Sequence, residues 1–211
     1  QQLKQWELPI VLIDRPVKAG GLPFVGIDNR SGATAMTQHL INQGHRRIAF
    51  IGGRLNTRFS AARITMYPQE MTRLGVPPGE QYVFPTGFTT QSGEIGAARM
   101  LAQLADKPLP TAIVAINDVC ALGVLSHLKK SGFRVPQDIA LTGCDNLFFT
   151  QYLDPPLTTV DLRATERGSF AMEELINALN GGDTTPISHK LECSLIVRES
   201  CGAMLGRERF R

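Results

Sequence analysis

The chain has 211 residues, of which 43% are hydrophobic, 19% charged and 7% aromatic. This composition is typical of a soluble globular protein with one or two domains. The 22 basic and 19 acidic side chains give a net charge of +3, which is too small to indicate a nucleic-acid-binding or membrane-binding surface. No apolar run reaches the roughly 18–20 residues of a membrane span, and the N-terminal segment lacks the features of a signal peptide.

The four Cys residues are widely separated in the sequence, and no two have the CxxC spacing of a zinc or redox motif. Cys120 and Cys144 lie inside apolar segments, so we expect reduced thiols in the core of a cytoplasmic protein. The cysteine pattern therefore excludes a disulfide scaffold and a zinc module.

The N-terminal part contains two short runs rich in Val and Ile, at residues 10–14 and 24–28, which we interpret as buried strands. The next segment has apolar residues at helical spacing between positions 33 and 41. This spacing predicts a helix that ends at Gly44.

The central part repeats one pattern, an apolar strand followed by a helix or loop. We expect strands at 48–53, 82–86, 112–117 and 139–145, and helices at 57–74, 90–105 and 118–131. The repeat is roughly 30 residues long, the length of a βαβ unit, which predicts a parallel sheet with helices on both faces.

The C-terminal part adds an extended run at 158–162, a helix from about 165 to 180 and a last strand around 190–198. Only two strands precede Ser31 and at most one follows Pro186, so a second sheet made from these pieces would be thin. We therefore expect the chain to be the C-terminal part of a longer protein, with the N-terminal part missing.

Three segments together carry a family resemblance: 116–123 (INDVCALG), 135–146 (VPQDIALTGCDN) and 155–160 (PPLTTV). In this order and spacing they resemble the effector-binding domain of the LacI/GalR family of bacterial transcriptional regulators. Residues 25–29 and 197–200 fit the same pattern, and the resemblance covers nearly the whole chain.

The resemblance implies a periplasmic-binding-protein-like α/β fold, with two Rossmann-like subdomains built on parallel sheets and joined by crossovers. Residues 1–27 and 161–191 would belong to the subdomain nearer the DNA, and residues 28–160 and 192–201 to the distal one. Residues 202–211 would form a C-terminal tail. A small sugar or sugar-acid effector would lie in the cleft between the subdomains.

The resemblance also implies partners. Family members bind operator DNA through an N-terminal helix-turn-helix domain, which this chain does not contain, and they act as homodimers in the cytoplasm. We expect the partner surface to include residues 29–43 and 82–105.

Polar residues stand where the apolar strand runs end, the place where open α/β sheets bind their ligands. Asn117, Asp118 and Asp145 occupy such positions, and each can instead cap the helix that follows. We expect Asp118 to be a cap, and both interpretations are open for Asn117. For Asp145 the resemblance implies hydrogen bonds to effector hydroxyls or ring nitrogens.

Three further side chains become effector contacts only through the resemblance. Arg63 taken alone would be a solvated helix charge, but it matches the family's effector-binding arginine. The family pattern has Gly three residues later where this chain has Met66, so we expect looser packing of that helix. Phe88 would stack on the apolar face of the effector, with a core aromatic as the alternative, and Asp14 would contact the effector from the other subdomain.

The loop at residues 53–58 carries Arg54 and Arg58 just before a helix N-terminus. Such a helix end attracts anions, and the loop resembles the corresponding stretch of the gluconate-operon repressor branch. A sugar acid or phosphorylated sugar would account for the two charges. Solvated loop arginines account for them equally well, so both interpretations are open.

No enzyme motif is present in the sequence: we find no HExxH, GxSxG, Walker loop or GxGxxG. We therefore predict no catalytic residue, no metal and no cofactor. The preferred function is effector sensing in a transcriptional repressor. The alternative is a periplasmic-type sugar-binding transport protein, and a Rossmann-type enzyme is the least supported reading.

Overall fold

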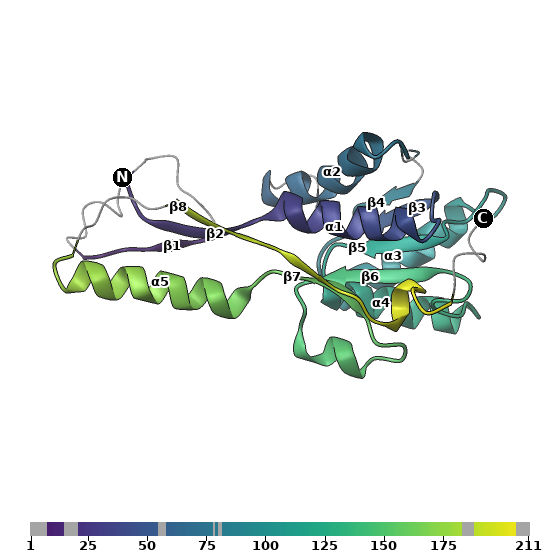
Figure 1. The fold of residues 1–211 in the computed structure, drawn as a ribbon. Coiled ribbons are helices and arrows are strands. Elements are labelled where there is room, and N and C mark those ends of the chain that lie inside the picture. Colours follow the sequence, from purple (N-terminus) through teal and green to yellow (C-terminus); the bar gives the residue numbers. More distant parts are fainter. Residues whose placement is uncertain are drawn as a thin grey trace. The chain divides into compact units, whose positions relative to one another are not determined.

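The computed structural model describes residues 8–14, 21–54, 58–77, 79, 82–182 and 188–205, with the side chains of 58–63 outside the description. The chain divides into two compact units. The smaller unit contains Gln1–Asn29 and Leu162–Cys193, and the larger contains Arg30–Asp161 and Ser194–Arg211. Each unit has a sheet of its own (Figure 1).

The larger unit is built on a six-stranded sheet in the order β4-β3-β5-β6-β7-β9. The strands are β3 (Ile48–Ile51), β4 (Val83–Phe84), β5 (Ala112–Ala115), β6 (Ala140–Cys144), β7 (Thr158–Asp161) and β9 (Ser194–Ile196). The first five in the spatial order are parallel and β9 is antiparallel to β7. The expected parallel sheet is confirmed.

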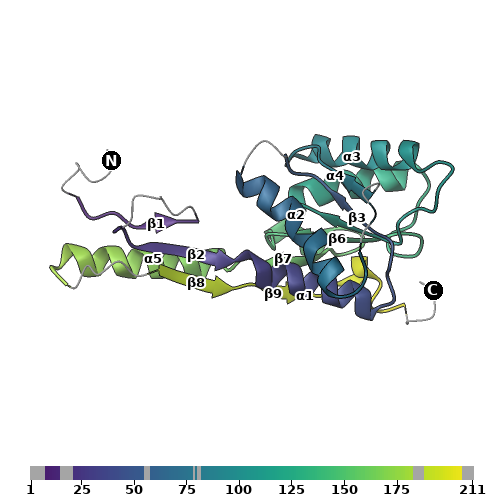
Figure 2. The same ribbon diagram turned by 90° about the horizontal axis from the view of Figure 1, so that it is seen from above.

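Helices cover both faces of this sheet, as the repeat predicts. They are α1 (Asn29–Asn42), α2 (Arg58–Arg73), α3 (Thr90–Gln103) and α4 (Asp118–Lys130). The ring of Phe50 lies 5.2 Å from that of Tyr67 on α2, whereas its neighbour Ile51 packs on Gly96 of α3. Because adjacent strand residues point to opposite faces, α2 and α3 lie on opposite sides of β3 (Figure 2).

Each of the remaining two helices lies in one of these two helical layers. Leu40 of α1 lines the same small cavity as Phe50 and Tyr67, so α1 shares the face of α2, whereas α4 packs on α3. The short 3₁₀ helices η3 (Phe148–Tyr152) and η4 (Glu199–Cys201) also belong to the larger unit. Cys120 and Cys144 are buried in this core with free thiols, as expected.

The smaller unit has a thin sheet of three parallel strands in the order β1-β2-β8. The strands are β1 (Leu12–Ile13), β2 (Phe24–Asp28) and β8 (Ser188–Glu192), and α5 (Ala164–Leu179) packs against β1 and β2. The expectation of one strand around 190–198 is wrong. The chain passes from one unit to the other after Cys193, so β8 and β9 belong to different sheets.

One buried polar residue in the larger unit, His45, makes folding dependent on pH. It follows α1, is fully buried, and its Nδ1 lies 3.0 Å from Oγ1 of Thr111. Burial, which disfavours the charged imidazole, lowers the pKa of His45 to about 4. The folded protein therefore holds this side chain neutral under conditions in which the unfolded chain protonates it.

We predict that His45→Gln removes a pH-dependent part of the stability. In the wild type this part is fully present above the unfolded pKa of about 6.5 and is lost as the pH falls toward about 4. The contribution of His45 to the free energy of unfolding should fall by ~2–3 kcal/mol from pH 7 to pH 4.5. Urea unfolding at both pH values measures it. The control His189→Gln, at an exposed position of β8, should keep the wild-type slope, and an unchanged slope in His45→Gln would refute the assignment.

Candidate functional site

Four of the seven residues expected to bind an effector lie along one edge of the larger sheet. Arg54 and Phe88 are in the loops that follow β3 and β4, Asn117 directly precedes α4 at the end of β5, and Asp145 follows β6. These four strands are parallel and adjacent, so their carboxyl ends meet at the same edge. Open α/β sheets bind ligands at this edge.

A backbone hydrogen bond between two glycines joins the loops after β3 and β4. The N–H of Gly53 donates to the carbonyl of Gly87 at 2.6 Å, and the backbone at Gly52 and Gly87 has φ of +107° and +127°. A Cβ at Gly52 would lie only 2.4 Å from the side chain of Ile116, so the loop can approach β5 only with glycine there. Arg54 and Phe88 are exposed beside this contact, with 36% of Phe88 accessible.

Asn117 ties the Phe88 loop to the start of α4. Its Oδ1 accepts a hydrogen bond from the N–H of Cys120 at 2.8 Å, and its Nδ2 donates to the carbonyl of Phe88 at 3.2 Å. Asn117 is therefore the N-cap of α4. A direct contact between Asn117 and a ligand stays a prediction.

The expectation that Asp118 caps α4 is wrong, because the cap lies one residue earlier. Asp118 is fully buried; its carboxylate accepts from Oγ1 of Thr159 at 2.6 Å and from the N–H of Leu147 at 2.8 Å. Burial raises the pKa of Asp118, and these two hydrogen bonds oppose that rise. Asp118 thus anchors the loop after β6 to β7 from inside the protein.

The turn after β6 has an unusual backbone. Asp145 has φ of +120°, which residues other than glycine seldom adopt, and Asn146 has φ of +52°, in the left-handed region that asparagine tolerates. The N–H of Asp145 donates to the carbonyl of Val160 at 2.9 Å, and the N–H of Asn146 to Oγ1 of Thr159 at 3.3 Å. Such strain persists only where the surroundings hold it and occurs frequently at functional sites. The sequence motif contains both residues, and asparagine at 146 is a residue type that tolerates positive φ, whereas nothing in the motif indicates a φ of +120° at Asp145.

The other three expected site residues are not brought to this edge by any described contact. The side chains of Arg58 and Arg63, in the first half of α2, lie outside the described residues. Asp14 belongs to the smaller unit, has φ of +64°, and forms an ion pair with Arg167 of α5.

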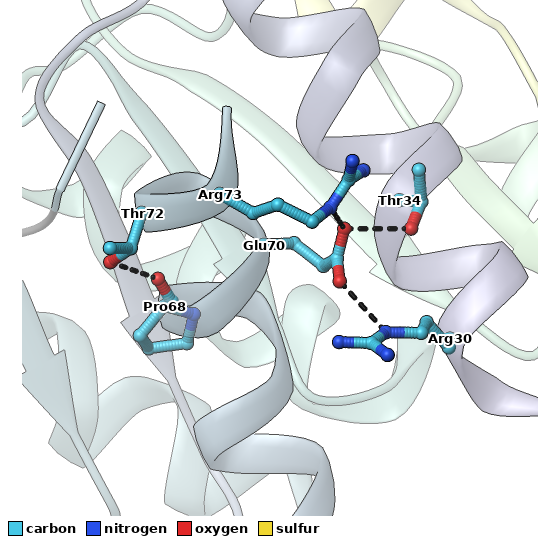
Figure 3. Close-up of polar contacts among 6 residues, drawn as sticks. All are labelled: Arg30, Thr34, Pro68, Glu70, Thr72 and Arg73. Carbon is cyan, nitrogen blue, oxygen red and sulfur yellow. Dashed lines mark hydrogen bonds and ion pairs between the residues drawn. The ribbon is translucent and has the colours of Figure 1, made fainter. Parts of the chain in front are cut away.

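Helix α2 is continuous from residue 58 to residue 73, through both Met66 and Pro68. Proline has no N–H, so Pro68 cannot donate the backbone hydrogen bond to the preceding turn of the helix. Its carbonyl accepts a hydrogen bond from Oγ1 of Thr72 at 3.0 Å. The buried carboxylate of Glu70 attaches this part of α2 to α1 (Figure 3).

Glu70 accepts hydrogen bonds from Nε of Arg73 at 2.8 Å, from Oγ1 of Thr34 at 2.9 Å and from Nε of Arg30 at 2.9 Å. Burial raises the pKa of Glu70, but these three hydrogen bonds outweigh burial and hold it below its usual value. The helix that carries Arg63 is therefore fixed to α1 by a buried charge. The sequence contains no local signal for this contact, because its partners on α1 lie 36 and 40 residues away.

Neither a metal centre nor a membrane segment is found in the part of the chain that the structure describes. Among those residues, no group of three or more His, Cys, Asp or Glu side chains could hold a metal ion. Within the same ranges, no helix combines the length and the apolar character that a membrane span requires.

Comparison with known proteins shows the family to which the chain belongs. A family model described as a periplasmic binding protein-like domain matches residues 37–201. The HTH-type transcriptional repressor CytR of Escherichia coli is 36% identical over 197 residues, which are 93% of this chain and 57% of that protein. The chain thus spans little more than half the length of this relative.

Two solved structures are similar in fold. One is a sugar-binding transcriptional regulator of the LacI family from Escherichia coli, complexed with phosphate, with a TM-score of 0.83 and 28% identity over 94% of this chain and 70% of that one. The other is the complex of the transcriptional regulator CelR with cellobiose, with a TM-score of 0.80 and 32% identity over 90% of this chain and 58% of that one. The resemblance inferred from the sequence motifs is confirmed.

We predict that Glu70→Ala lowers the free energy of unfolding by ~1–2 kcal/mol, because it removes the buried acceptor that joins Thr34 and Arg30 of α1 to α2, while the two exposed arginines can bind water instead. Urea unfolding monitored by circular dichroism measures the loss. The matched control is Asp154→Ala, which removes the ion pair of Asp154 with Lys129 on the surface and should leave the unfolding midpoint unchanged. A wild-type unfolding midpoint in Glu70→Ala would show that the Glu70 contacts are dispensable.

Proposed function

Because the chain belongs to the family of periplasmic-binding-protein-like domains, we propose that it is the effector-sensing part of a LacI-type transcriptional repressor, with a sugar or sugar acid as its effector. The strained backbone of Asp145, at the carboxyl edge of the larger sheet, is the observation that carries this proposal. Phe88 and Arg54 lie on the neighbouring loops of the same edge.

The chemistry of this edge suits a polyhydroxylated ligand. The Asp145 carboxylate follows a strand end and can accept hydrogen bonds from hydroxyl groups, which are strong when the acceptor is charged. The exposed part of the Phe88 ring offers a surface for the C–H face of a sugar. Arg63 on α2 is the proposed donor to the same ligand.

The arginines near the start of α2 favour a ligand that also carries negative charge. Arg54 is exposed after Gly53, and Arg58 begins α2, where the helix end adds positive potential. The similar structures hold phosphate in one case and cellobiose in the other. These two ligands represent the anionic and the neutral class that a binding experiment has to compare.

In the whole protein, the effector would act by binding one conformation better than another and thereby changing the affinity for operator DNA. We propose a cytoplasmic homodimer that reads the operator through an N-terminal helix-turn-helix domain. The four free thiols of this chain favour this assignment over a periplasmic-type sugar-binding transport protein.

We predict that a sugar ligand raises the melting temperature of the full-length protein and that Asp145→Asn and Arg63→Ala each weaken binding about tenfold or more. A ligand at 100 times its dissociation constant adds about 2.7 kcal/mol of stability, which a thermal-shift measurement detects. The panel is cellobiose, D-gluconate and glucose 6-phosphate.

Asp106→Asn and Arg99→Ala, at exposed positions of the turn after α3 and of α3 itself, are the controls and should bind like the wild type. If both site variants keep the wild-type shift, the assigned site is wrong. If only cellobiose binds, the argument from Arg54 and Arg58 fails while the regulator assignment stands.

A second prediction concerns DNA. Because we assign this chain to effector sensing alone, it should bind DNA weakly, without sequence preference and less tightly as salt increases. A fluorescence-anisotropy titration with a random-sequence duplex library at two salt concentrations, followed by selection and sequencing of the bound fraction, measures this. Enrichment of one sequence with nanomolar affinity would overturn the assignment.

A further inference from the structure

Asn146 connects the turn at Asp145 to two distant segments of the larger unit. Its Nδ2 donates to Oδ2 of Asp161 at 3.1 Å, and its Oδ1 accepts from Nη2 of Arg198 at 2.9 Å. A carboxylate can only accept and a guanidinium can only donate, so only this orientation of the amide satisfies both neighbours.

Both partners of Asn146 stand close to places where the chain passes between the two units. Asp161 is the last residue of β7 and of the larger unit before the chain enters the smaller one at Leu162. Arg198 follows β9, with which the chain returns to the larger unit at Ser194. Asp161 and Ser194 are themselves paired across β7 and β9.

Arg198 also holds the remainder of the loop that begins at Asn146. Its Nη1 donates to the carbonyl of Leu157 at 2.6 Å and to Oγ1 of Thr150 at 3.2 Å. The loop is thus fixed at its beginning, at η3 and near its end by one guanidinium. A movement of the Asp145 turn therefore has to change the contacts of Asn146 with Arg198 and Asp161.

We propose that Asn146 is a positioning residue that couples ligand binding at Asp145 to the two segments that cross between the units. The inference rests on the proposed function, since it requires a ligand at Asp145. A ligand that pulls on the Asp145 carboxylate turns the adjacent residue, and the Asn146 amide passes this change to Asp161 and Arg198. Coupling of this kind needs a contiguous set of contacts and a measurable energetic link.

The variant Asn146→Gly separates the side chain from the backbone conformation. Glycine adopts a φ of +52° without strain, so the turn can form while both side-chain hydrogen bonds are lost. Asp161→Ala removes one partner from the other side, and Asp161→Asn is the conservative variant, because it retains an acceptor oxygen. The matched control is Asn42→Ala, which removes an exposed hydrogen bond with Gln38 on α1.

The experiment measures amide hydrogen exchange of this chain with and without each of cellobiose, D-gluconate and glucose 6-phosphate. In the wild type and in Asn42→Ala, a probe that binds should slow exchange both at residues 145–147 and at residues 160–163 and 195–198, by about fivefold or more. In Asn146→Gly and Asp161→Ala the slowing should remain at 145–147 and disappear from the two distant segments, and Asp161→Asn should restore it.

Calorimetric titration with the same probes separates this role from a general loss of structure. Asn146→Gly should keep a dissociation constant close to that of the wild type, since Asp145 and Phe88 are unchanged. If the distant segments still respond in Asn146→Gly, the coupling role is wrong and the proposed function stands. If no probe slows exchange at 145–147 in the wild type, the proposed function fails, and this inference fails with it.

Discussion

The carboxyl edge of the larger sheet depends on one buried carboxylate. Asp118 lies at the start of α4, yet its side chain points into the protein and accepts from Thr159 on β7 and from the backbone of Leu147. A buried carboxylate without donors would be strongly destabilising. The two donors therefore have to be in place whenever the unit is folded, and the loop after β6 is held in position before any ligand arrives.

The other loops at this edge are also held by hydrogen bonds between polar groups of neighbouring loops. Asn117 caps α4 and binds the Phe88 loop, and Gly53 binds Gly87. Each contact joins two adjacent strand ends. Together they form a preorganised edge, and a preorganised edge loses less entropy when a ligand binds.

The sequence predicts the elements of the larger unit well. Its strands are covered by helices on both faces, so each strand is a continuous apolar run. Continuous apolar runs such as Ile48–Ile51 and Ala112–Ala115 stand out from the amphipathic helices between them. Asn117 and Asp145 were expected at the site for a related reason, because they stand where apolar strand runs end, whereas Phe88 was expected only through the family resemblance. The motif also marked the segment around Asp145, but only through its likeness to a family.

The contacts that the sequence did not reveal join residues far apart in the chain. Arg198 reaches Asn146 across 52 residues and Arg30 reaches Glu70 across 40, and no local pattern encodes such pairs. The cap of α4 was misplaced by one residue, because Asn117 and Asp118 are both good caps and only burial distinguishes them. Positive φ at Asp145 arises from its surroundings rather than from its residue type.

The glycine contact between the two loops has a consequence for how ligand preference can change. Its backbone geometry excludes larger residues at Gly52, so the positions of the loops are the same whatever side chains they carry. Arg54 is exposed on this backbone, and 36% of Phe88 is accessible. Under the proposed function, exchanging charge for polarity at Arg54 or one ring for another at Phe88 would change the ligand preference, while the contact of Gly53 with Gly87 is kept.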